Sequence, residues 1–152
     1  MSALAVLVAS TILAHCPVSH VRYGPDSSAE PGLRAVPWIA TSNGAFAGHL
    51  FYWGSTSWGK KRMLGARIFT TQRVRKVQPK VLWLARRGAH HGALDVRGRR
   101  LDAPGAFHTH FANRGTYDFP SYVEIPAPGC WRVTVSAGGA SGSVVFAALD
   151  AI

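Results

Sequence analysis

Apolar and polar residues alternate with a period of two along most of the chain after Pro37, in short runs rich in β-branched and aromatic residues. Gly, Pro or a polar turn closes each run, and no window carries the pattern of a long amphipathic helix. Short strands at this spacing predict an all-β sandwich or barrel. We expect eight strands, at residues 49–53, 66–72, 80–86, 93–97, 106–111, 121–125, 130–137 and 143–149.

The alternation also predicts which side chains form the core, because successive side chains of a strand point to opposite faces. Val123 and Ile125 share one face, and Trp83 and Trp131 lie in runs with apolar residues two positions away, so we expect both tryptophans between the sheets. The apolar positions around residue 95 fall out of step with those after residue 100. This predicts a β-bulge near Gly98.

Composition divides the chain into three segments. Residues 1–14 are small or apolar and are typical of a secretory leader, although they lack the Lys or Arg of an n-region; a buried first strand or helix is the alternative. Residues 15–37, rich in Pro, Gly and Ser, predict an irregular arm, and residues 38–152 form the sandwich. A leader of this kind implies an extracytoplasmic protein, secreted or associated with the envelope.

The net charge bears on which partners the protein binds rather than on its fold. Lys and Arg number 17 against seven Asp and Glu, which gives a formal net charge of +10. Such a surface attracts polyanions in general, and anionic envelope polymers or an anionic lipid surface are the expected partners. A length of 152 residues suits one domain.

Three motifs are more specific than the general pattern: Cys16-Pro17 after the leader, Gly98-Arg99-Arg100-Leu101-Asp102, and PSYVEIPAPGCW at residues 120–131. Together they resemble a family of uncharacterised bacterial exported proteins and lipoproteins. The resemblance implies an Ig-like antiparallel β-sandwich of about 7–9 strands and no established activity. His15 stands directly before Cys16, where a lipoprotein signal needs a small residue, so we expect cleavage near Ala14 rather than lipidation.

Two cysteines in an exported chain predict one intramolecular disulfide, between Cys16 and Cys130. The alternative is a lipidated or free Cys16 beside an inert Cys130. No cofactor is expected.

Catalytic chemistry has little support in the sequence. His108 and His110 share one strand face and are the metal candidates, which leaves a metal-dependent hydrolase as one alternative, but no Cys or carboxylate stands with them in a recognised ligand pattern. The chain has no Gly-x-Ser-x-Gly motif. We therefore expect a non-catalytic structural or binding module rather than an enzyme.

Basic residues gather in the loops expected between strands. If consecutive strands run antiparallel, the loop at residues 54–65 and the turn at residues 86–92 lie at the same end of the sandwich. Both ends are then basic, which is not the single stripe of a specific nucleic-acid interface. The other alternative function is binding of a polyanion without a specific nucleic-acid interface: a cell-wall polymer, an acidic polysaccharide or nucleic acid. The expected binding residues are Trp58, Lys60, Lys61, Arg62, Arg86 and Arg87.

Overall fold

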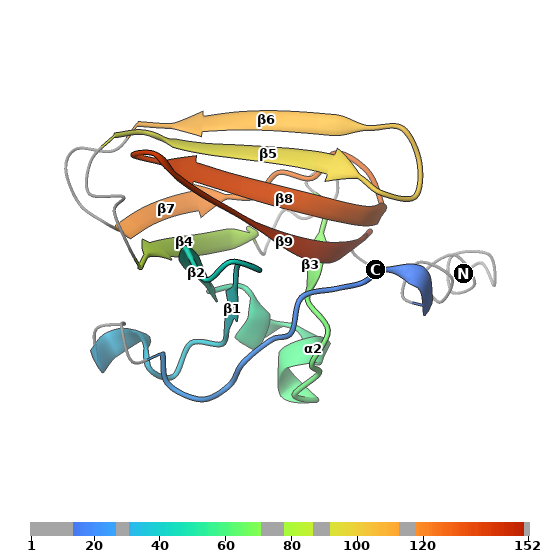
Figure 1. The fold of residues 1–152 in the computed structure, drawn as a ribbon. Coiled ribbons are helices and arrows are strands. Elements are labelled where there is room, and N and C mark those ends of the chain that lie inside the picture. Colours follow the sequence, from blue (N-terminus) through green and yellow to red (C-terminus); the bar gives the residue numbers. More distant parts are fainter. Residues whose placement is uncertain (1–13, 27–30, 71–77, 87–91, 113–117, 151–152) are drawn as a thin grey trace.

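The protein is a β-sandwich of two sheets, as the sequence predicts (Figure 1). The computed structural model describes residues 14–26, 31–70, 78–86, 92–112 and 118–150. One sheet has the strand order β1-β2-β4-β7 and the other the order β3-β9-β8-β5-β6. The strands are β1 (Trp38–Ala40), β2 (Phe46–Leu50), β3 (Arg67–Phe69), β4 (Lys80–Ala85), β5 (Leu94–Arg100), β6 (Ala106–Phe111), β7 (Asp118–Tyr122), β8 (Gly129–Ala137) and β9 (Ala140–Leu149).

Neighbouring strands are antiparallel except for β3, which pairs with β9 in parallel. The hairpin of β8 and β9 is the longest pairing, and its turn places Gly138 and Gly139 at positive φ, as expected for a tight glycine turn. Helical structure in the described part of the chain is short: η1 (Pro31–Leu33), η2 (Trp53–Ser55) and α2 (Ser57–Lys60). None of the helices in these ranges is long and apolar enough to cross a membrane.

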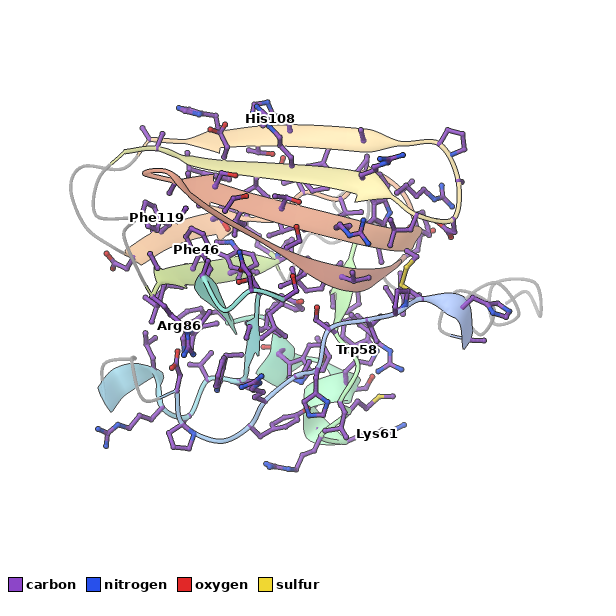
Figure 2. All side chains as sticks on the ribbon, viewed as in Figure 1. Phe46, Trp58, Lys61, Arg86, His108 and Phe119 are labelled. Carbon is purple, nitrogen blue, oxygen red and sulfur yellow. A yellow bond between two sulfur atoms is a disulfide. The ribbon has the colours of Figure 1, made fainter. Side chains whose placement is uncertain are left out.

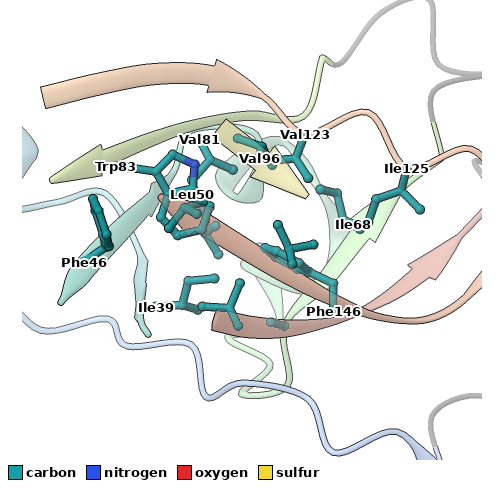
Figure 3. Close-up of a cluster of buried hydrophobic side chains, with 14 of the residues drawn as sticks. Ile39, Phe46, Leu50, Ile68, Val81, Trp83, Val96, Val123, Ile125 and Phe146 are labelled. Carbon is teal, nitrogen blue, oxygen red and sulfur yellow. The ribbon is translucent and has the colours of Figure 1, made fainter. Parts of the chain in front are cut away.

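The core lies between the two sheets (Figure 3) and is built by the predicted alternation. Trp83 is fully buried and Trp131 is 1% exposed, which confirms their predicted place. Along β8, inward apolar residues alternate with Arg132, Thr134 and Ser136 on the outer face. Val123 and Ile125 are buried beyond the end of β7, so the alternation continues where the strand pairing stops.

The predicted bulge near Gly98 is wrong. Strand β5 keeps an unbroken register with both β6 and β8 across this position. A side-chain carbon at Gly98 would overlap the ring of Phe107 on the facing strand, so the glycine makes room for an aromatic side chain. The sequence also gave no sign of β1, and the run expected as a strand at residues 49–53 is divided between the end of β2 and η2.

The N-terminal arm is irregular but firmly attached to the sandwich. Cys16 and Cys130 form a disulfide with a Cα–Cα distance of 5.5 Å, which confirms the predicted pairing. Val21 is fully buried in the core, and isolated bridges join His20 to Gly65 and Arg22 to Trp38. The disulfide is compatible with an extracytoplasmic location, because such bonds persist in oxidising compartments.

Candidate functional site

The predicted basic loop forms a compact turn around α2, which we call the α2 turn (residues 56–63). Thr56 begins the helix: its Oγ1 accepts a hydrogen bond from the Gly59 amide at 3.2 Å and donates one to the Trp53 carbonyl at 2.6 Å. Gly59 is required here, because a Cβ at this position would lie 2.3 Å from the Trp53 carbonyl oxygen. The backbone of the turn is therefore fixed by contacts inside the fold.

Trp58 is half-buried and packs toward the core. Its ring stacks on Phe69 with centroids 4.5 Å apart, and the centroid of the tilted Trp53 ring lies 5.6 Å away. A ring engaged in this way offers little free face to a ligand. The indole of Trp58, predicted to take part in polyanion binding, is one of the anchors of the α2 turn.

Lys60, Lys61 and Arg62, three of the five cations of the predicted surface, are exposed on the α2 turn. Arg62 has a φ of 50°, a left-handed conformation that is uncommon for residues other than glycine, and its guanidinium lies 4.4 Å from the centroid of the Tyr23 ring. The Tyr23 hydroxyl donates to the Met63 carbonyl at 2.6 Å and accepts from Trp53 Nε1 at 2.9 Å. The arm thus holds the α2 turn in place.

Arg86 does not join this surface. Strands β2 and β4 are antiparallel neighbours in one sheet, with Phe46 opposite Ala85 and Leu50 opposite Val81. The loops that follow the two strands therefore leave from opposite ends, and Figure 2 shows Arg86 well apart from Trp58 and Lys61. The expectation failed because β3 lies in the other sheet, which breaks the assumed alternation. Arg87 lies outside the described residues.

Arg86, which is exposed, belongs to a cluster with two buried polar side chains, Asp26 and His49, that the sequence did not reveal. Its Nη2 donates to Oδ1 of Asp26 at 2.9 Å, and its guanidinium lies 5.1 Å from the ring centroid of Trp38. His49 is fully buried beside them, with Nε2 3.7 Å from the second oxygen of Asp26. Burial lowers the pKa of His49, although the Asp26 carboxylate acts to raise it. The cluster attaches the arm to β2 and β4.

His108 and His110 share the outer face of β6, as predicted, and the structure adds a carboxylate. Asp95 on β5 is the register partner of His110, and one of its oxygens accepts from His108 at 2.6 Å and from His110 at 3.2 Å. The hydrogen bond from His108 and then that from His110 lower the pKa of Asp95. Among the described residues, no group of three or more His, Cys, Asp or Glu side chains is arranged to hold a metal ion.

The sequence suggests that Asp95 pairs with the neighbouring arginines; its contact with the two histidines could not be predicted, because it depends on the strand register. The residues are 13 and 15 positions apart in the chain, and no ligand motif joins them.

The motif at residues 98–102 has a structural role near the disulfide. Oδ1 of Asp102 accepts from Arg100 Nε at 2.8 Å and from the Cys130 amide at 3.1 Å. Burial acts to raise the pKa of Asp102, but the hydrogen bonds from Arg100 and Cys130 outweigh it and leave the pKa lowered. Gly129 has a φ of 150°, and a Cβ there would lie 2.5 Å from Arg100 Nε. The motif thus ties the end of β5 to the start of β8.

Comparison with known protein families, with curated proteins and with solved structures gave no match. The Ig-like relationship and the resemblance to exported bacterial proteins therefore stay predictions.

Proposed function

We propose that the protein is a non-catalytic module of the bacterial envelope, exported from the cytoplasm, that binds an anionic polymer through its excess positive charge. The proposal rests on one observation: the formal net charge is +10, and most of the Lys and Arg side chains in the described part of the chain form no ion pair there. Among the Lys and Arg side chains that the structure describes, only Arg86 and Arg100 form ion pairs. Among the other described cations, Lys60, Lys61, Arg97, Arg99 and Arg132 are exposed.

The disulfide supports the extracytoplasmic part of the proposal, since a bond between Cys16 and Cys130 needs an oxidising environment to persist. The leader-like residues 1–14 support it from the sequence, and residues 1–13 of this stretch lie outside the described residues.

Binding to immobilised polymers tests the proposal. The probes are a glycerol-phosphate teichoic acid, polygalacturonate and neutral dextran. We expect the protein to bind both anionic polymers and to ignore dextran. Release of counterions should weaken binding roughly ten- to hundredfold between about 50 and 200 mM salt for two to four contacts. Equal binding to dextran, or no binding to either anionic polymer, would overturn the proposal.

A further inference from the structure

The outer face of the five-stranded sheet carries three arginines whose arrangement the fold does not explain. Arg97 and Arg99 lie on β5 and Arg132 on β8, and all three point away from the core and are exposed. We call this surface the arginine face. Arg99 and Arg132 are direct register partners on neighbouring strands, and Arg97 is the next residue on the same face of β5. None of the three forms an ion pair within the described residues.

Like charges directly opposite each other on adjacent strands destabilise a sheet, because their side chains start only about 5 Å apart. Asp95 lies on the same face of β5 as Arg97 and Arg99, but its carboxylate is held by His108 and His110 of β6. An oxyanion placed between Arg99 and Arg132 would remove the repulsion. Arginine suits this role, since its planar guanidinium can give two parallel hydrogen bonds to a carboxylate or phosphate.

Side-chain hydroxyl groups lie next to the arginines on the same face of the sheet. Thr134 is the register partner of Arg97, and its Oγ1 is 2.7 Å from the hydroxyl of Ser143 on β9. The next cross-strand pair, Ser136 and Ser141, has its hydroxyl oxygens 3.1 Å apart. Cations and hydroxyls therefore lie side by side on one face of the sheet, whose strands β5, β6, β8 and β9 form the upper layer in Figure 1.

The side chains of the arginine face favour some classes of polyanion over others. The exposed large apolar side chains of the described residues, Phe51, Leu64, Leu101 and Tyr122, all lie outside strands β5, β6, β8 and β9. Single-stranded nucleic acid needs aromatic side chains on which its bases stack, and insertion into a lipid surface needs exposed apolar groups. A hydroxylated polymer with regularly spaced oxyanions needs only the cations and hydroxyls that are present.

We infer that the arginine face binds a linear, hydroxyl-bearing polyanion, with the oxyanions on Arg97, Arg99 and Arg132 and the polymer hydroxyls on the Thr134 and Ser143 pair. This inference rests on the proposed function and assigns its site. The oxyanion can be a phosphate, as in a polyol phosphate, or a carboxylate, as in an acidic polysaccharide.

Two triple variants with the same change in charge test the assignment. The first replaces Arg97, Arg99 and Arg132 by Gln, and the matched control replaces Lys60, Lys61 and Arg62 of the α2 turn by Gln. One charge-assisted hydrogen bond corresponds to about tenfold in affinity, so the first variant should bind roughly tenfold to a thousandfold more weakly than the parent, with a shallower salt dependence. The α2-turn variant should bind within a few-fold of the parent.

Thermal unfolding separates binding from folding. The arginine-face variant should unfold at the same temperature as the parent or higher, because the Arg99 and Arg132 repulsion is removed. A lower unfolding temperature would mean that the arginines stabilise the sheet, and would contradict their assignment to a ligand.

The probes distinguish the sources of the oxyanion and the role of the hydroxyls. Teichoic acid presents phosphates, polygalacturonate presents carboxylates on a hydroxylated chain, and poly-L-glutamate presents carboxylates without hydroxyls. We expect tighter binding of polygalacturonate than of poly-L-glutamate. Equal binding of these two would overturn the selection for a hydroxylated polymer.

The remaining outcomes separate the assignment of the binding site from the proposed function. Equal weakening in both triple variants would show attraction by net charge alone, and weakening in the α2-turn variant alone would place the site there. Either result would contradict the arginine face as the binding site but leave the proposed function intact. The same holds if the parent binds and neither variant binds more weakly. A parent that binds no anionic polymer overturns both.

Discussion

Single residues in this protein show how the same side-chain type takes different roles in different surroundings. His49 is fully buried beside Asp26, whereas His108 and His110 lie on an open sheet face and donate to Asp95. The alternation of residues 106–111 predicted the exposure of the two sheet histidines, because it needs only the period of a strand. The burial of His49 could not be predicted in this way, since all five residues of β2 are buried.

The pH dependence of stability should report the burial of His49. Its folded pKa is lowered, so the unfolded chain takes up a proton that the folded protein resists. The free energy of unfolding should therefore fall as the pH drops below about 6.5, by at most about 1.4 kcal/mol per pH unit. Urea unfolding between pH 7.5 and 5 measures this slope.

Two glutamine variants isolate the contribution of His49. His49→Gln should flatten the slope in that pH range, and His20→Gln, at an exposed position, should leave it unchanged. An unchanged slope in the first variant would show that another group is responsible.

The pattern of apolar and polar residues could predict where strands lie along the chain, but not which strands pair. Each of the eight expected runs shares at least two residues with an observed strand, because each run carries its own period. The assignment of strands to sheets carries no such local signal. Strand β3 pairs in parallel with β9, far along the chain, and β4 pairs directly with β2. The predicted site that combined the α2 turn with Arg86 depended on that assignment, and so it was divided.

The disulfide that joins the N-terminal arm to β8 should contribute strongly to the free energy of unfolding. The disulfide joins residues 114 positions apart and is buried together with Ala147. The chain-entropy model assigns about 4 to 5 kcal/mol to a loop of this length. Reduction, or replacement of both cysteines by Ser, should lower the free energy of unfolding by about this amount.

Denaturant unfolding with and without a reductant measures the effect, and mass spectrometry of the oxidised protein should show two hydrogens fewer than the reduced form. The serine double variant should not respond to the reductant. Identical unfolding midpoints for the oxidised and reduced parent would contradict the prediction.

At the scale of the whole molecule, a well-packed core is combined with a surface of one predominant charge. The two sheets share one continuous cluster of buried side chains, so the fold does not depend on surface ion pairs. Apart from Arg86 and Arg100, the Lys and Arg side chains that the structure describes form no ion pair there, although the cations of Arg22, Arg62 and Lys80 lie over aromatic rings. Self-repulsion of this kind opposes the compact state, and the same charges favour association with a polyanion.

Salt should therefore act on folding and binding in opposite directions. Raising NaCl from about 10 to 150 mM shortens the screening length from about 30 to 8 Å, which reduces the repulsion within the fold as well as the attraction to a polymer. We expect the unfolding temperature to rise, by about 2 to 4 °C for each 1 kcal/mol of repulsion relieved, while polymer affinity falls. The variant with Gln at positions 97, 99 and 132 carries three fewer positive charges and should show a smaller rise. Calorimetry at several NaCl concentrations measures the effect, and an unfolding temperature that falls with salt in the parent would show that attractive charge pairs, rather than repulsion, dominate the electrostatics of the folded state.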